Sequence, residues 1–319
     1  MQRRIALAFA AASLLGAATL PATAQDKWPA KTIEMIYPYP PGNDTDAVMR
    51  LVAQGMSRRL GVQVQLINKP GGGGVVGISE MVRAKPDGHT IGVFTPGPGI
   101  TQILAGNTPY KQADYMPIGG VFVNDFVLAV RSGIPANTLG ELAAWAKASG
   151  KPVIIGSYSP AAVPALIAAK IARQDGWNYK VVAYPNPSAK ELTAGDADVV
   201  TSGAEMIAPF VKSGQAKVVS VWMPTRSTHY PNVPTGRESG YGDMYSWVGV
   251  IAPAGVPAEI ADKLSDAVRQ SLADKEVADL LARLGSPALP MNRAQMAQRI
   301  QSDTRWMGDL INELGLVRK

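Results

Sequence analysis

Two glycine- and proline-rich segments contain the residues best suited to hold a ligand. The first elbow, residues 37–46, reads Y-P-Y-P-P-G-N-D-T-D, and the second elbow, residues 68–74, reads N-K-P-G-G-G-G. Each lies between an apolar, strand-like run and a helix-like run. Glycine lets the backbone approach a ligand closely, and the first N–H groups of a helix have no acceptor within the helix. Both elbows therefore predict a site for a negatively charged group.

The residues that usually carry out enzyme chemistry are sparse. His89 and His229 are the only histidines, and neither has a second histidine or an acid at the spacing of metal ligands, so we expect no metal site. Residues 156–160 read G-S-Y-S-P, which approaches the serine nucleophile elbow but ends in proline. A secreted hydrolase that uses Ser157 or Ser159 is the alternative from the enzyme class, and we expect no catalytic residue.

A nucleotide cofactor is also not expected. Residues 72–77 fit the pattern G-x-G-x-x-G, but they follow the second strand of the chain, and no acid ends the next strand to bind a ribose. No lysine of the phosphate-loop type follows the glycines. Asp44, Asp46 and Glu205 could lie near the ends of these loops, where helix capping and pairing with the helix dipole explain them better than acid–base catalysis.

The amino terminus has the pattern of a secretory signal peptide. Arg3 and Arg4 precede an apolar run over residues 5–20, and Ala22 and Ala24 form an A-x-A cleavage motif. We predict that residues 1–24 are removed after Ala24 and that the protein is periplasmic after export by the Sec route. A membrane anchor is the alternative, but the run is shorter than the roughly 20 residues that a bilayer requires.

Composition limits the choice of partners. There is no cysteine, so neither a disulfide nor a lipid-attachment thiol is available. Without Arg3 and Arg4, the 31 basic residues fall to 29 against 25 acidic ones, a net charge of about +4. Such a mild positive field suits a small anionic ligand, whereas nucleic-acid binders concentrate their basic residues on one face. We expect no nucleic acid as a partner, and a monomer.

The elbows alternate with strands and helices. Strands are predicted at residues 32–37, 62–67 and 90–94, with helices at 44–60 and 75–85 between them. Because β-α-β crossovers are right-handed and give parallel strands, the loops that leave these strands emerge at one edge of a sheet. Those loops are the two elbows and residues 95–99, which bring Thr95 and Gly97 to the same edge.

A second α/β unit follows. Strands and helices alternate again over residues 126–222, an irregular connection covers 223–243, and a strand at 245–252 precedes three amphipathic helices at 257–273, 275–284 and 292–314. We predict that the last helices pack on the first unit. One lobe then comprises residues 25–123 and 246–319, the other comprises residues 124–245, and two chain crossings form a hinge beside a cleft.

The chain resembles one family along almost its whole predicted mature length. The first elbow is similar to the P-F-P-P-G-G-x-x-D loop of the Bug, or TctC, family of periplasmic solute-binding proteins, and residues 68–77 are similar to its N-R-P-G-A-G-G-x-x-G. Further matches are K-P-D-G-H-T at 85–90, P-N-V-P-T at 231–235 and S-W-V-G-V-I-A-P-A-G at 246–255.

This resemblance implies a type II periplasmic binding fold of the α/β class, with two lobes whose sheets have parallel cores. Such proteins close on a carboxylate and deliver it to the membrane subunits of a tripartite tricarboxylate transporter. In the family, the ligand is held by backbone amides and bridging waters from the first two loops. When the family's binding positions are transferred to this chain, the resemblance implies these binding residues in the first lobe: Tyr39, Pro40, Gly42, Asn43, Asp46, Gly72, Gly73 and Gly74.

The second lobe departs from the family pattern. Residues 156–164 lack the family's S-x-G-x-G-x-x-x-H motif, residues 182–186 lack V-P-Y-K-G, and Ser202 stands where the family often has an aspartate. The residues that would replace the usual ligand set are Ser157, Tyr158, Ser159, Ala161, Tyr184 and Ser202. The loss of a carboxylate and a lysine disfavours amino acids, so we expect a mono- or dicarboxylate, aromatic ones included. A ligand-dependent partner of a sensor kinase is a further alternative, because its cleft would be identical.

Overall fold

The computed structural model describes residues 28–185, 187–242 and 244–317. The predicted signal peptide, residues 1–24 with cleavage after Ala24, lies outside the described residues. So do Asn186, in one of the segments that depart from the family pattern, and Asp243, the last residue of the irregular connection predicted at 223–243. In the part of the chain that is described, no helix combines the length and the apolar character needed to cross a membrane.

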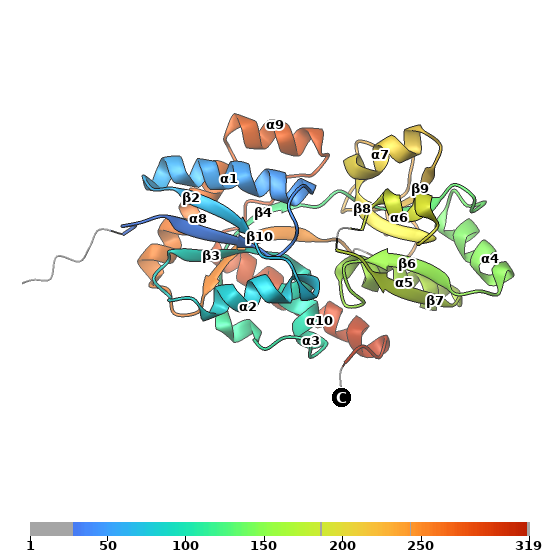
Figure 1. The fold of residues 1–319 in the computed structure, drawn as a ribbon, viewed down its shortest axis with the longest axis horizontal. Helices are drawn as coiled ribbons and strands as arrows, with labels where there is room; N and C mark the ends of the chain where they lie inside the picture. Colours follow the sequence, from blue (N-terminus) through green and yellow to red (C-terminus); the bar gives the residue numbers. More distant parts are fainter. Residues whose placement is uncertain (1–27, 186, 243, 318–319) are drawn as a thin grey trace, which may run out of the picture.

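The described chain forms two mixed five-stranded sheets (Figure 1). The first has the order β2 (Val64–Asn68), β1 (Ile33–Tyr37), β3 (Thr90–Phe94), β10 (Trp247–Pro253) and β4 (Tyr115–Val123). The second has the order β7 (Tyr179–Ala183), β6 (Val153–Ser157), β8 (Val199–Gly203), β5 (Phe126–Arg131) and β9 (Ala216–Trp222). In each sheet the first three strands are parallel and the last two pairings are antiparallel. The alternating α/β units expected from the sequence are therefore present in both.

Strand β4 is the main element that sequence analysis missed. Its residues include Pro117, Gly119 and Gly120, which interrupt a strand pattern. Proline is tolerated because β4 lies at the edge of its sheet, where one side of the backbone needs no partner strand. A Cβ at Gly120 would come 2.5 Å from the carbonyl oxygen of Leu289, so the glycine permits the close approach of a neighbouring segment.

Helices cover both faces of each sheet. On the first sheet, α1 (Asp44–Leu60), α8 (Ala258–Ser271) and α9 (Lys275–Arg283) pack on one face, and α2 (Val75–Arg83) and α10 (Arg293–Glu313) pack on the other. On the second sheet, α4 (Leu139–Ser149) and α5 (Val163–Asp175) lie opposite α6 (Ala189–Ala194) and α7 (Ala204–Lys212). Short helical turns occur at η1 (Gly72–Gly74), η2 (Gly97–Thr101), α3 (Gln102–Leu104) and η3 (Gln112–Asp114). We call the unit around each sheet the first and the second lobe.

The lobes are linked by two chain crossings and by direct packing. The chain leaves the first sheet after β4 and returns to it at β10. Helix α10 belongs to the first lobe but also reaches α5 of the second, where Glu313 forms an ion pair with Arg173 at 3.6 Å. One hydrophobic cluster accordingly contains buried residues from both lobes, among them Met307 and Leu166. The lobes are in contact rather than separated by an open cleft.

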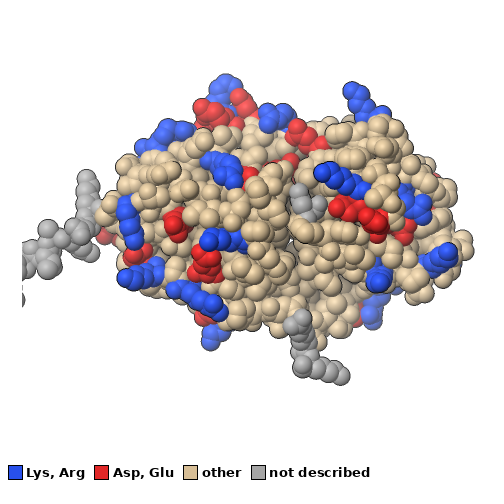
Figure 2. All heavy atoms as spheres, in the orientation of Figure 1, with Lys and Arg blue, Asp and Glu red and all other residues tan. Residues whose placement is uncertain are grey.

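Charged side chains of both signs are interspersed over the face shown in Figure 2. No continuous basic surface covers the part of the described chain that faces the viewer in this picture. This distribution agrees with the mild net charge of the sequence and gives no support to nucleic-acid binding on that face.

Candidate functional site

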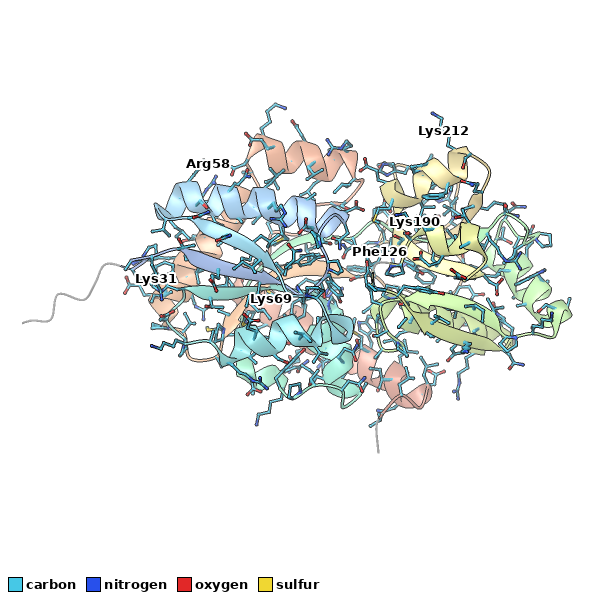
Figure 3. All side chains as sticks on the ribbon, viewed as in Figure 1. Lys31, Arg58, Lys69, Phe126, Lys190 and Lys212 are labelled. Atoms are coloured by element: carbon cyan, nitrogen blue, oxygen red, sulfur yellow. The ribbon has the colours of Figure 1, made fainter. Side chains whose placement is uncertain are left out.

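A pocket lies where the two lobes meet, and we call it the inner pocket. Its cavity volume is about 60 Å³, which is enough space for several waters or a small organic molecule. Figure 3 shows Phe126, one of its lining residues, at the junction of the lobes. The lining residues are Tyr37, Tyr39, Asn43, Asp44, Thr45, Thr95, Gly97, Asn124, Phe126, Tyr158, Ala162, Val163, Pro164, Ser202, Gly203, Met206 and Ser246.

Three helices begin at this pocket. Helix α1 starts from the first lobe at Asp44, whereas α5 starts at Val163 and α7 at Ala204, both from the second. Asp44 and Val163 line the inner pocket, as does Gly203, the residue before α7, whereas the N–H of Ala204 donates to the carbonyl of Asp125 at 2.9 Å. The first amides of a helix have no acceptor within the helix, and the helix dipole places partial positive charge at this end. Three such ends directed at one pocket form an environment suited to an anion without any cationic side chain.

The first elbow is held by buried polar contacts. Asn43 caps α1, because its Oδ1 atom accepts the backbone N–H of Asp46 at 2.9 Å and the hydroxyl of Tyr37 at 2.8 Å. The carboxylate of Asp46 accepts bonds from Arg50 at 3.0 and 3.1 Å and from the side chain of Asn68 at 2.9 Å. Strand β2 and the start of α1 are thereby fixed to each other, which keeps the helix terminus in place.

A pair of tyrosines separates the inner pocket from a second hollow, the outer groove. Tyr39 of the first lobe and Tyr158 of the second have ring centroids 5.0 Å apart and line both spaces. Burial raises the pKa of Tyr39 to about 12, so its hydroxyl remains protonated and can donate a hydrogen bond. The other residues that line the outer groove are Pro38, Pro40, Pro70, Gly71, Gly72, Gly73, Gly74, Ser159, Ala183, Tyr184 and Pro185.

The second elbow lies at the outer groove and has a different role from the first. Gly73 has a φ of 65°, and a Cβ at this position would come 2.6 Å from Nε2 of Gln102 and 3.2 Å from Oγ of Ser159. Gln102 donates a hydrogen bond of 2.7 Å to Ser159 in the second lobe. The absence of a side chain at Gly73 therefore lets the first lobe approach the second.

Asp44 is the one charged residue among the described residues that line the inner pocket. Burial, with Glu205 and Asp125 nearby, raises the pKa of its carboxyl to about 6. Its Oδ2 atom lies against the second lobe, because a Cβ at Gly203 would come 2.1 Å from it. The sequence analysis favoured helix capping and pairing with the helix dipole for Asp44. The cap of α1 is Asn43, but Asp44 does lie in the first turn of this helix, where an acid pairs with the dipole, and it also lines the inner pocket.

The predicted site residues divide between the two spaces. Those at the inner pocket are Tyr39, Asn43, Thr95, Gly97, Tyr158 and Ser202. Those at the outer groove are Tyr39, Pro40, Gly72, Gly73, Gly74, Tyr158, Ser159 and Tyr184. The structure thus brings most of them close to the lobe junction, but it does not gather them into a single cavity.

Four predicted residues line neither space: Gly42, Asp46, Ser157 and Ala161. The backbone N–H of Gly42 donates to Asp46, whose carboxylate is occupied by this elbow network. Ser157 is fully buried at the end of β6, and its hydroxyl has no hydrogen-bond partner among the described residues. The carbonyl of Ala161 accepts the hydroxyl of Thr101, which is a contact between the lobes.

Sequence analysis missed several residues that line the inner pocket. Asn124, Phe126 and Ser246 lie at or beside the two chain crossings, whose positions were predicted but whose side chains were not assigned to the site. Val163, Gly203 and Met206 belong to the starts of α5 and α7, and the same argument that selected the first elbow could have identified them. The remaining missed residues are Tyr37, Asp44, Thr45 and Pro164.

The serine-hydrolase alternative finds no support in this geometry. Ser157 is inaccessible, and the hydroxyl of Ser159 is bonded to Gln102 rather than to a base. Within the described chain, His229 contacts Asp125 at 3.4 Å and His89 contacts Asp87 at 3.2 Å, so neither histidine is paired with one of these serines. A nucleophile activated by histidine is therefore not formed at this site.

Comparison with known proteins identifies the family. The model of the tripartite tricarboxylate transporter family receptor, TctC, matches residues 48–316. The chain is 31% identical over 327 residues to the "UPF0065 protein in gbd 5'region" of Cupriavidus necator, with 100% of this chain and 99% of that protein covered. It is 28% identical over 301 residues to protein BugT of Bordetella pertussis, with 91% of each chain covered.

Solved structures share the fold. The periplasmic binding protein BugD has a TM-score of 0.82 at 26% identity, over 92% of this chain and 100% of that one. MatC from Rhodopseudomonas palustris with bound malate has a TM-score of 0.81 at 24% identity, over 89% of this chain and 99% of that one. The family is one of transporter receptors and BugD is a periplasmic binding protein, so neither is an enzyme. The chain therefore belongs to the TctC receptor family of tripartite tricarboxylate transporters and has its two-lobed periplasmic binding protein fold.

Proposed function

We propose that this protein captures a small organic carboxylate, mono- or dicarboxylate and aromatic ones included, in the inner pocket. It then presents the ligand to the membrane subunits of a tripartite tricarboxylate transporter. We further propose that it acts in the periplasm, after removal of residues 1–24. Family membership supports a receptor for small carboxylates, while the choice of pocket rests on the geometry at the lobe junction.

The observation that carries the proposal is the convergence of three helix starts on a pocket without a cationic lining side chain among the described residues. A carboxylate in such a pocket would accept hydrogen bonds from amides that have no acceptor within their helices. Lys31, Arg58 and Lys212, which Figure 3 labels, lie on the outside of the lobes rather than at the junction. The binding energy for the anion would therefore come from the backbone.

The two chain crossings are the proposed hinge, with residues 25–123 and 246–319 on one side and 124–245 on the other. Polar contacts between the lobes, such as that from Gln102 to Ser159, would form as the cleft closes. Closure would sequester the ligand from water, which strengthens each hydrogen bond to it. It would also create the combined surface that the transporter subunits recognise.

We assign different roles to the predicted binding residues. Asn43, Thr95 and Ser202 would contact the ligand or its bridging waters, since they line the inner pocket from both lobes. Tyr39 and Tyr158 would close the pocket toward the outer groove. The glycines at 72–74 would act through closure rather than by contact with the ligand, because they line the outer groove.

Ligand screening tests the proposal. The mature protein, beginning at Gln25, is purified and its melting temperature measured with a library of mono- and dicarboxylates, sugars and cations, followed by calorimetry on each hit. Adipate and malate are suitable first members, because structures of this fold have been solved with them. We expect at least one carboxylate to stabilise the protein. Stabilisation by sugars or cations while every carboxylate is inert would overturn the proposal.

A variant links the binding to the inner pocket. Ser202→Leu would fill the pocket from β8, where Ser202 is 4% exposed, and should abolish the thermal shift given by the carboxylate hit. Ser132→Leu, outside both spaces, is the control and should bind normally. An unchanged thermal shift in Ser202→Leu, with the variant folded, would show that the ligand binds elsewhere.

A further inference from the structure

Asp44 is an acidic side chain without a partner in a pocket that we assign to an anion. No hydrogen bond or ion pair joins its carboxylate to another described residue, although it is only partly exposed and lies against Gly203 of the second lobe. A buried or half-buried carboxylate is normally paired, since removing its charge from water costs free energy. The dipole of α1 offsets part of that cost, because Asp44 lies in the first turn of the helix, and a cationic group of a ligand could offset the rest.

The charges around Asp44 do not provide that partner. From α7, Glu205 faces it, and from the first chain crossing Asp125 does so; both are acidic and disfavour its ionised form. His229, from the connection between β9 and β10, favours the ionised form, but its ring contacts Asp125 instead, at 3.4 Å. Each of the other two acids has its own contact: Ser227 donates to Asp125 at 2.6 Å, and Arg283 approaches Glu205 to 3.9 Å.

Acids in the first turns of α1 and α7, Asp44 and Glu205, thus offset the positive ends of these two helices, whereas α5 has no acid in its first turn. A ligand that carries only negative charge would suit the start of α5 but not the surroundings of Asp44. A dicarboxylate would place one of its anionic groups in the same small pocket as Asp44, and like charges at short distance repel. A cationic group beside Asp44 would remove the mismatch.

We propose that Asp44 selects a zwitterionic ligand, a carboxylate that also carries an ammonium group, by pairing with that ammonium. This inference rests on the proposed function and narrows its ligand class. It also revises the expectation that amino compounds are disfavoured: the second lobe does lack the family's aspartate, at Ser202, but the first lobe supplies a carboxylate to the same pocket. The carboxylate that pairs with an ammonium group would therefore belong to the first lobe rather than to the second.

Matched ligand pairs test this choice. Succinate, glutarate and adipate are compared by calorimetry at pH 7.5 with 4-aminobutanoate, 5-aminopentanoate and 6-aminohexanoate, in which one carboxylate is replaced by an ammonium at the same chain length. We expect the amino member of at least one pair to bind at least about tenfold more tightly than its dicarboxylate, as for a charge-assisted contact.

Variants assign the preference to Asp44. Asp44→Asn should weaken the amino acid that binds by at least about tenfold and leave or improve the binding of its dicarboxylate partner. Asp266→Asn, a surface acid that contacts Arg269 at 3.0 Å, is the control and should change neither affinity. Lowering the pH from 7.5 to 5 should weaken binding of the amino acid more in the wild type than in Asp44→Asn, because only the wild type loses the carboxylate charge of Asp44.

The outcomes separate the two proposals. If dicarboxylates bind and the amino acids do not, or if Asp44→Asn leaves the preference unchanged, the zwitterion inference is wrong while the proposed function stands. If no amino acid binds more tightly than the dicarboxylate of its pair, the zwitterion inference is likewise wrong. If neither these compounds nor the wider carboxylate library bind, the proposed function fails together with it.

Discussion

The two elbows have similar compositions but meet the second lobe in different ways. The first elbow presents the capped start of α1 to the inner pocket. The capping hydrogen bonds of Asn43 are made within the first lobe, whereas Tyr39 and Asp44 of the same elbow lie against the second lobe. The second elbow lines the outer groove, where Gly73 lies close to Gln102 and Ser159. Glycine and proline next to a strand therefore do not define one function. The first elbow orients a helix terminus and contacts the second lobe through side chains, whereas the second elbow permits contact because Gly73 has no side chain.

The largest effect is expected from the first elbow. Asn43→Ala removes the cap of α1 and leaves the buried Tyr37 hydroxyl without this acceptor, so the free energy of unfolding should fall by about 2–4 kcal/mol in urea denaturation. Thr138→Ala removes the exposed cap of α4 and should cost only about 1 kcal/mol. Equal losses would mean that the first elbow is an ordinary helix start.

The contact between the first elbow and the second lobe is tested at Gly203. Its φ of −58° suits any residue, yet a Cβ there would lie 2.1 Å from Asp44 Oδ2 in the described arrangement. Gly203→Ala should therefore turn the Asp44 carboxylate away from its place or oppose closure, and either change should weaken ligand binding by about tenfold, roughly 1.4 kcal/mol. Gly140→Ala, where a Cβ meets open space, is the control. Normal affinity in Gly203→Ala would show that Asp44 and Gly203 do not come this close in the ligand-bound protein.

The second elbow is tested by two neighbouring glycines. Gly72 and Gly73 have φ values of 57° and 65°, so alanine carries a similar backbone penalty at both, about 1–2 kcal/mol. A Cβ at Gly72 would make only an ordinary contact with Val75 at 3.5 Å. We expect Gly73→Ala to weaken all ligands alike by a few-fold in calorimetry, and Gly72→Ala to lower stability without that loss. If Gly72→Ala and Gly73→Ala bound the ligand equally well, the second elbow would have no role in closure.

The smallest effect concerns the pH dependence of stability. The pKa of Asp44 is raised to about 6 in the folded protein, above its ordinary value of 3.8, so the folded state binds this proton more tightly than the unfolded state. Wild-type stability is therefore reduced as pH rises from about 4 through 6. Asp44→Asn should be more stable than wild type by about 1 kcal/mol at pH 7.5 after solvent screening, and equal to it below pH 4. Thermal melts of the ligand-free protein at both pH values provide the measurement, and a constant difference would contradict the assignment.

Much of the fold could be predicted because its signals are local. Asn43 and Gly61 end α1 at the positions that their residue types favour, and the apolar spacing of the helix is visible along the chain. Strand β4 could not be recognised, because its proline and glycines are explained only by its place at a sheet edge and by the approach of Leu289. Signals of that kind depend on contacts between distant segments.

The candidate site shows the same division. The sequence by itself determined the strands of the two sheets apart from β4, the loops at their edges and the family, since these follow from periodicity, helix caps and contiguous motifs. Only the tertiary structure decided that Asp46 is occupied by Arg50 and Asn68, whereas Asp44, two residues earlier, lies unpaired against Gly203. Helical residues two apart point in different directions, and the environment that each one meets is supplied by segments far away in the chain. Burial and charge pairing, which set the chemistry of the pocket, arise only when the lobes come together.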